Sequence, residues 1–330
     1  MNRLAKRRRI LVALAAATAT VAAAPLASVA AESWPARTVR IIVPFAPGGG
    51  ADGSARVLAD LFGPQLGQAI VVENKPGAGS AIGVTSAAQS KDGHTLLMGS
   101  NSMVINPAPN PQIGYDVARD FDAVGMVSAQ PLVAVVPAES GIRSLADLIA
   151  QAKARPGQLT AGNSGSGTLA HIASEIFAGQ TGTEIIPVPY KGESALMPDL
   201  ISGRVAFGLL NLPSVAPHIK AGRLRALGVS SPQPVAELPD VPTLRSLGFS
   251  SLEVQGWAAL LAPKGAIPAE GLARLESQLS AALASDTVRS RFAALGLTPV
   301  IMSREETARF LQAEASRYAA VIRSRGIKAD

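Results

Sequence analysis

Short apolar runs alternate with amphipathic segments along the first third of the chain. Three of these runs are bounded by glycine, proline or charged residues and predict buried strands at 39–43, 70–72 and 95–98. Between them, Ala55, Leu58, Phe62 and Leu66 recur at helical spacing and predict a helix over 52–66. The segment 79–90 predicts another helix. This alternation indicates an α/β unit with a largely parallel sheet.

The same pattern restarts after Pro131. Strands are predicted at 132–136, 159–161, 185–188, 205–210 and 224–229, with helices at 144–154, 171–178, 195–202 and 214–221. Ser144 and Asp147 have the spacing of a capping box at the start of the first of these helices. The pattern therefore predicts a second α/β unit.

The C-terminal part carries a strand-like stretch at 251–261 and a leucine-rich helix pattern at 268–284. Ser303 and Glu306 have the spacing of a capping box before a last helix. We expect this part to return to the first unit. The predicted plan is then two lobes, 31–130 with 254–330 and 131–253, joined by crossings near 130 and 253. A cleft between two lobes is a usual ligand site.

The first 30 residues have the pattern of a secretory signal peptide. Five basic residues precede an apolar, alanine-rich run from 10 to 24, and small residues near Ala30 and Ala31 offer a cleavage site. The chain carries 30 Lys and Arg against 24 Asp and Glu, for a net charge of +6. Without the signal peptide the balance is 25 against 24. We therefore expect a periplasmic protein with no nucleic-acid partner.

Metal and thiol chemistry find little support in the composition. The chain has no cysteine, which excludes disulfides, a lipidated cysteine and thiolate metal sites. Its three histidines, His94, His171 and His218, have the spacing of no zinc motif. We expect no cofactor and no metal.

The turn after the first strand is the strongest local signal. Phe45 precedes Gly48, Gly49 and Gly50, and the helix over 52–66 follows directly. The N–H groups of a helix N-terminus lack intrahelical partners and carry the positive end of the helix dipole, so this turn predicts an anion site. The glycine spacing matches neither a dinucleotide fingerprint nor a P-loop. The alternative is a tight turn without a ligand, with Asp52 as the helix cap.

A second turn of this kind follows the strand at 159–161. Ser164, Ser166 and Thr168 can donate to a carboxylate beside the backbone N–H groups. The alternative is a loop in which Thr168 caps the next helix and His171 is a packed, hydrogen-bonded histidine. A nucleophile elbow requires the pattern G-x-S-x-G, which Ser166 breaks after Gly162.

Two further turns have the same position after a strand. Tyr190, Gly192 and Glu193 follow the strand at 185–188, and Ser100 with Asn101 follows the strand at 95–98. In open α/β sheets, ligands bind at the carboxyl ends of the strands. We therefore expect the four turns to meet around one ligand.

The chain closely resembles the substrate-binding receptors of tripartite tricarboxylate transporters, the Bug-type or TctC-type periplasmic receptors. The resemblance runs from about Trp34 to the C-terminus and is carried by ordered segments at 44–49 with Asp52 and 55–56, 72–79, 92–99, 164–168 with His171, 190–192, 211–214, 222–227 and 238–243.

This resemblance implies a two-lobed periplasmic binding protein of type II-like fold, with two mostly parallel sheets, that is not an enzyme. It implies a monomer that closes on a small carboxylate and delivers it to the membrane subunits of a tripartite transporter. The ligand-binding residues expected on this basis and from the turns are Phe45, Gly48, Gly49, Asp52, Ser100, Asn101, Ser164, Ser166, Gly167, Thr168, Tyr190, Gly192, Glu193 and Asn211.

The chain departs from the pattern of the family at three positions. Relatives usually carry Asp at the positions of Ala206 and Leu210, and a small neutral residue at the position of Glu193. An extra acid near the cleft would repel a dianion and favour a ligand with an amino or amide group. The alternative is that Glu193 caps its helix or faces solvent.

Two other functions remain open from the sequence. A secreted serine hydrolase would use Ser164 or Ser166 together with a histidine and an acid. A sensor partner would bind the same solute but contact a membrane kinase.

Overall fold

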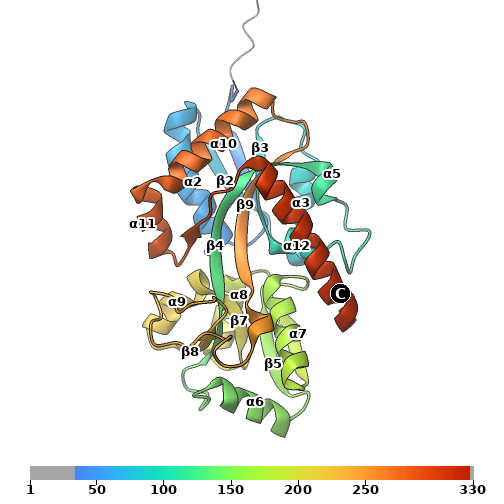
Figure 1. Cartoon of the computed structure of the whole chain (residues 1–330), viewed down its shortest axis with the longest axis vertical. Helices are drawn as coiled ribbons and strands as arrows, with labels where there is room; N and C mark the ends of the chain where they lie inside the picture. Colours follow the sequence, from blue (N-terminus) through green and yellow to red (C-terminus); the bar gives the residue numbers. More distant parts are fainter. Residues whose placement is uncertain (1–33, 328–330) are drawn as a thin grey trace, which may run out of the picture. The chain divides into compact units, whose positions relative to one another are not determined.

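The computed structural model describes residues 34–327, which belong to one compact unit. The predicted signal peptide therefore lies outside the described residues. Two long strands, β4 (Phe121–Pro137) and β9 (Gln255–Pro263), run side by side through the middle of this unit (Figure 1). β4 pairs with β9 as far as Pro131 and then, from Leu132, with β7 (Gly208–Asn211) and β8 (Leu224–Val229). The partners of β4 thus change at one point in the strand.

The first lobe, as we use the term, comprises the elements around three parallel-paired strands: β1 (Val39–Val43), β2 (Ile70–Asn74) and β3 (Thr95–Ser100). The short strand β10 (Thr298–Pro299) pairs with the first half of β4. The helices of this lobe are α2 (Gly50–Leu66), α3 (Ala81–Ala88), α4 (Asn101–Ile105), α5 (Val117–Asp120), α10 (Ala269–Ala284), α11 (Asp286–Ala294) and α12 (Arg304–Arg325), with a 3-10 turn η1 (Ala78–Ser80).

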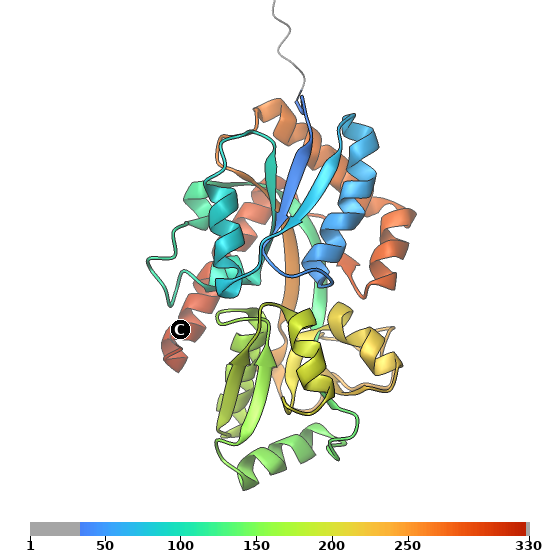
Figure 2. The same cartoon turned by 180° about the vertical axis from the view of Figure 1, so that it is seen from behind.

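The second lobe comprises the elements between the two long strands. Its parallel pair is β5 (Leu159–Asn163) with β6 (Ile185–Pro189), seen from behind in Figure 2, and β7 and β8 lie against β4. Its helices are α6 (Leu145–Ala154), α7 (Leu169–Thr181), α8 (Glu193–Ile201) and α9 (Leu212–Lys220), with a 3-10 turn η2 (Ser250–Leu252).

The α/β class and the two-lobed fold are confirmed, but the main sheet is mixed rather than mostly parallel. Parallel pairing is found at β1–β2, β1–β3 and β5–β6, whereas β4 pairs antiparallel with β7, β8, β9 and β10. The physical reason is the double crossing. β4 carries the chain into the second lobe and β9 carries it back, so these neighbours run in opposite directions.

Burial on both faces explains why β1 reads as a continuous apolar run. Ile41 and Val43 belong to one core cluster with Leu58 and Phe62 of α2, while Ile42 belongs to another, and all are fully buried. Strands covered on both faces have this composition. The second lobe has a further cluster that joins α8, β7 and α9. These cores hold rigidly the turns that follow each strand.

The lobe boundaries at 131 and 253 stay a prediction, because the described residues form one compact unit. The change of partners along β4 and the start of β9 at Gln255 lie close to these positions. Among the described residues, none of the helices combines the length and the apolar character needed to cross a membrane.

Candidate ligand-binding site

Four helices of nine or more residues begin beside one small cavity of about 60 Å³, as does the five-residue helix α4. The residues at the start of each of the four longer helices line this smaller cavity: Gly49, Gly50, Ala51 and Asp52 at α2, Thr168, Leu169 and Ala170 at α7, Gly192, Glu193 and Ser194 at α8, and Asn211 at α9. The first N–H groups of a helix have no intrahelical acceptor, and they carry partial positive charge. The arrangement therefore concentrates hydrogen-bond donors for an anion.

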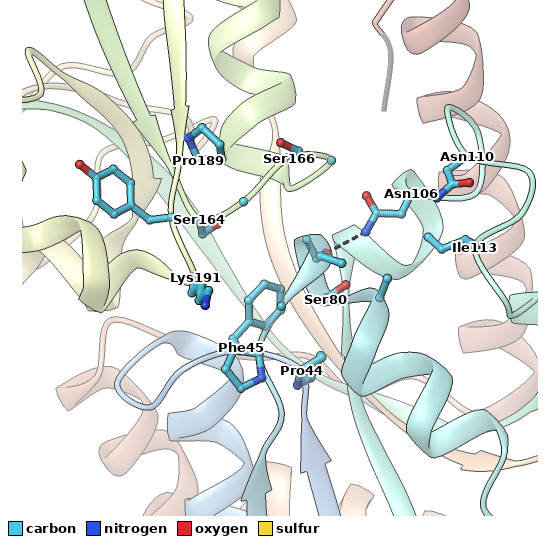
Figure 3. A pocket seen from close by; sticks show the side chains of 18 of the residues that line it. Pro44, Phe45, Ser80, Asn106, Asn110, Ile113, Ser164, Ser166, Pro189 and Lys191 are labelled. Atoms are coloured by element: carbon cyan, nitrogen blue, oxygen red, sulfur yellow. Dashed lines mark hydrogen bonds between the residues drawn. The ribbon is translucent and has the colours of Figure 1, made fainter. Parts of the chain in front are cut away.

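A larger cavity of about 320 Å³ adjoins the smaller one. Phe45 and Ser164 line both cavities. Figure 3 shows Phe45 near the middle of the larger cavity, with Ser164 and Lys191 on one side and Ser80, Asn106 and Ile113 on the other. Phe45 thus stands where the two cavities meet, and its ring is available for apolar contact with a ligand.

The two lobes touch each other around these cavities. The Ser194 hydroxyl of α8 donates to the Pro47 carbonyl at 2.9 Å. Gly165 lies against Gly79, since a Cβ on Gly165 would be 3.2 Å from the Gly79 Cα. A Cβ on Gly167 would overlap the Asn106 side chain. The two lobes are therefore in contact beside both cavities.

The predicted turns do meet at a shared hollow. The smaller cavity is lined by Gly49, Asp52, Ser100, Asn101, Thr168, Gly192, Glu193 and Asn211, the larger one by Ser166, Gly167 and Tyr190, and both by Phe45 and Ser164. Gly48 lines neither cavity. Whether these residues bind a ligand stays a prediction.

Gly48 and Asp52 serve the turn itself. The helix cap is Gly49, so the expectation that Asp52 caps the helix is wrong. Instead, the Asp52 carboxylate accepts from Gly48 N at 3.0 Å, from the Arg56 guanidinium at 2.9 Å and from Asn74 Nδ2 at 2.9 Å. Burial alone would raise the pKa of Asp52, but these hydrogen bonds hold it below its usual range. The ionised Asp52 side chain therefore stabilises the glycine turn through these hydrogen bonds.

Three other predicted site residues use their polar groups within the protein. Asn101 Oδ1 accepts from Trp257 N at 3.0 Å, and its Nδ2 donates to the Gln255 carbonyl at 3.1 Å. The Thr168 hydroxyl donates to the Gly165 carbonyl at 2.7 Å, and Thr168 caps α7 as the alternative reading predicted. The Tyr190 hydroxyl donates to Asp199 Oδ2 at 2.8 Å. These side chains shape the cavities and hold their walls.

His171 is buried, and its Nδ1 accepts from Gly167 N at 3.2 Å. This confirms the packed, hydrogen-bonded histidine that the sequence favoured. No group of three or more His, Cys, Asp or Glu that could hold a metal occurs within residues 34–327.

Glu193 is buried in the wall of the smaller cavity, with 6% of its surface exposed. Its Oε1 accepts from Asn211 N at 3.1 Å and from Asn211 Nδ2 at 2.8 Å. Burial raises the pKa of Glu193 above its usual range, against hydrogen bonds from Ser214 and Asn211 that favour the charged form. The alternative that Glu193 caps its helix or faces solvent is therefore wrong, since Gly192 is the cap of α8 and Glu193 is buried.

Sequence reasoning missed Gln130, which lies in β4 and lines the smaller cavity. Its Nε2 donates to Asn211 Oδ1 at 3.3 Å. The available signal was a glutamine at the predicted crossing near 130, next to the apolar run at 132–136. Gly256 and Trp257 of β9 also line this cavity and were not singled out.

Comparison with known proteins gives consistent matches over nearly the whole chain. Residues 54–327 match the family described as "Tripartite tricarboxylate transporter family receptor". Protein BugT of Bordetella pertussis is 41% identical over 315 residues, which cover 94% of this chain and 95% of BugT.

Two solved structures resemble the fold closely. The periplasmic binding protein BugD is 28% identical with a TM-score of 0.85, covering 89% of this chain and 99% of BugD. The structure "R. palustris Rpa4515 with adipate" is 33% identical with a TM-score of 0.86, covering 89% of this chain and 99% of that protein.

Proposed function

Because the chain belongs to the family of tripartite tricarboxylate transporter receptors, we propose that it is a periplasmic receptor that captures a small carboxylate between its lobes. The observation that carries this proposal is the convergence of four helix N-termini on the smaller cavity. A related protein of known structure was solved with adipate, a dicarboxylate. The protein acts as a binding protein and not as an enzyme.

Backbone amides supply the recognition of the carboxylate. Among the residues that line the smaller cavity there is no Lys, Arg or His. The negative charge is therefore balanced by the N–H groups at the starts of α2 and α7, as in other anion sites at helix N-termini. The hydroxyls of Ser100 in the first lobe and Ser164 in the second lobe line the same cavity and add donors.

Ligand binding works through closure of the lobes. A ligand that contacts α2 of the first lobe and α7 of the second stabilises the closed state over the open one. It shifts the population toward the closed state by the difference between its binding free energies for the two states. β4 and β9 cross between the lobes, so they are the segments about which closure occurs. The closed protein, a monomer, then presents its surface to the membrane subunits of a tripartite transporter.

Thermal unfolding with a panel of carboxylates tests this function. A ligand at about 100 times its Kd stabilises the folded protein by about 2.7 kcal/mol, which corresponds to a rise in Tm of roughly 5 °C. The panel contains monocarboxylates, dicarboxylates including adipate, and acid amides, with the corresponding neutral esters as controls. We expect at least one carboxylate to raise Tm while its ester does not. Absence of any shift across the panel contradicts the proposal.

A proline substitution locates the binding at the helix start. Ala51 is the second residue of α2, and proline in the first turn removes its N–H but keeps the helix. Ala51→Pro should reduce the ligand-induced shift by more than half. The matched control is Ala146→Pro at the second residue of α6, away from both cavities, which should leave the shift unchanged. Equal ligand-induced shifts in Tm in both variants would mean that the ligand does not bind at the start of α2.

A further inference from the structure

The wall of the smaller cavity already contains an acidic side chain of the protein itself. Glu193 is the first residue of α8, and its carboxylate reaches Asn211, the residue that precedes α9. The carboxylate thus lies between the N-termini of two helices, a position that favours negative charge. The start of α9 therefore already has a carboxylate acceptor before any ligand arrives.

No cation balances this group. Among the ion pairs of the described residues, none includes Glu193, and no basic side chain lines the smaller cavity. The other acid that lines this cavity, Asp52 of the first lobe, is paired with Arg56. When Glu193 is ionised, a negative charge of a ligand placed near it faces a like charge that has no cationic partner, and the two repel each other.

A chain of hydrogen bonds fixes which groups are left as acceptors. Asn211 Nδ2 donates to Glu193, so Asn211 Oδ1 faces Gln130 and accepts from its Nε2. Gln130 Oε1 and Glu193 Oε2 are then buried without a hydrogen bond of ordinary geometry. Gln130 Oε1 and the second oxygen of Glu193, which has at most the Ser214 hydroxyl beside it, can each accept from a group that donates hydrogen bonds.

We propose that Glu193 takes the place of a ligand's second carboxylate, so that the site selects monocarboxylates whose other end carries a hydrogen-bond donor. This inference rests on the proposed function, since it needs a carboxylate at α2 and α7. The donor end is an amide or an ammonium group and is directed to Glu193 and Gln130. Glu193 is then the residue that determines specificity against dicarboxylates.

Binding of matched ligands by titration calorimetry tests this selection. The probes are adipate, its monoamide adipamate and 6-aminohexanoate, together with the shorter pair succinate and succinamate. Each pair differs only in one end group. Of adipamate and succinamate, the wild-type protein should bind the one that fits the site better roughly 100-fold more tightly than the dicarboxylate of the same length. Comparison of adipamate with 6-aminohexanoate shows whether the donor is an amide or an ammonium group.

The variant Glu193→Gln removes the charge and keeps an oxygen for Asn211. In this variant, the affinities for the monoamide and for the dicarboxylate of the same length should lie within about threefold of each other, chiefly because dicarboxylate binding improves. The control Glu184→Gln changes an exposed acid of the second lobe outside both cavities and should keep the wild-type preference.

The possible failures are distinct. If the wild-type protein binds both members of each pair equally, or the dicarboxylate better, the inference is overturned while the proposed function stands. If Glu193→Gln keeps the full preference for the monoamide, Glu193 is not its source. If no carboxylate binds to the wild-type protein, the receptor function fails, and the inference fails with it.

Discussion

At the scale of single residues, the two acids of the smaller cavity have opposite roles because their surroundings differ. Asp52 is met by a guanidinium, an amide and a backbone N–H, and its pKa is held below the usual range. Glu193 has only neutral donors, and burial raises its pKa. Asp52 therefore stabilises the fold at neutral pH, whereas burial disfavours the charged form of Glu193.

The variant Asp52→Asn should lower the free energy of unfolding at pH 7 by about 2 kcal/mol, because charge-assisted hydrogen bonds are lost. Since the pKa of Asp52 is lower in the folded protein, its contribution is present above the unfolded pKa of about 3.9 and is lost as the pH falls through the folded pKa. Urea unfolding from pH 7 to pH 3 measures the difference in the free energy of unfolding between the wild-type protein and the variant, and this difference should shrink toward acid pH.

The control for this variant is Asp286→Asn, because the Asp286 side chain is 97% exposed. It should change stability by less than about 0.5 kcal/mol at either pH. A loss in Asp52→Asn that is equally large at pH 3 and pH 7 would show that the charge of Asp52 is not what stabilises the turn.

At the scale of elements, the sequence predicted most strands and helices and the parallel pairs, but not the antiparallel pairing of β4 and β9. β1 and β8 were predicted with their observed bounds, and the capping box of Ser303 and Glu306 is present at α12. The first half of β4 was missed because Asp122, Gly125, Ser128 and Gln130 interrupt its apolar pattern. α4 and α5 are too short to give a helical period.

The sequence predicted the residues of the turns that line the cavities, but not the lining residues of the two crossing strands. Glycine and hydroxyl residues that follow strands can be read from the chain, and thirteen of the fourteen predicted residues line the cavities. Gln130, Gly256 and Trp257 belong to the crossing strands, whose antiparallel contact over more than a hundred residues of sequence carries no local signal. The burial of Glu193 likewise could not be predicted from the residues next to it in sequence, because it depends on contact with Asn211.

The contact between η1 and the turn before α7 gives a test of closure. A Cβ on Gly79 would overlap the Ser166 carbonyl oxygen across the lobes, whereas a Cβ on Gly182, at the end of α7, meets nothing. Both glycines have a left-handed φ, +57° and +62°, so alanine costs about 1 kcal/mol at either position. Gly79→Ala should weaken ligand binding by roughly tenfold or more, and Gly182→Ala should not.

Calorimetric titration and ligand-free thermal unfolding separate the two effects. If the lobes open without ligand, the two variants lose similar stability in the absence of ligand, and only Gly79→Ala loses affinity. A much larger loss of ligand-free stability in Gly79→Ala, with affinity unchanged, would mean that the lobes stay in permanent contact.

At the scale of the whole molecule, β4 and β9 join two lobes whose turns supply opposite walls of the cavities (Figures 1 and 2). Each lobe has its own buried cluster, so each presents its turns on a rigid base. The ligand then acts as the contact that completes the interface between them.

The most direct measurement is a crystal structure of the protein with the carboxylate that gives the largest thermal shift. The account predicts the carboxylate oxygens within hydrogen-bond distance of the N–H groups at the starts of α2 and α7, beside Ser164 and Phe45, with the lobes closed. A carboxylate bound only outside the two cavities, or held by a basic side chain without contact to these helix starts, would contradict it.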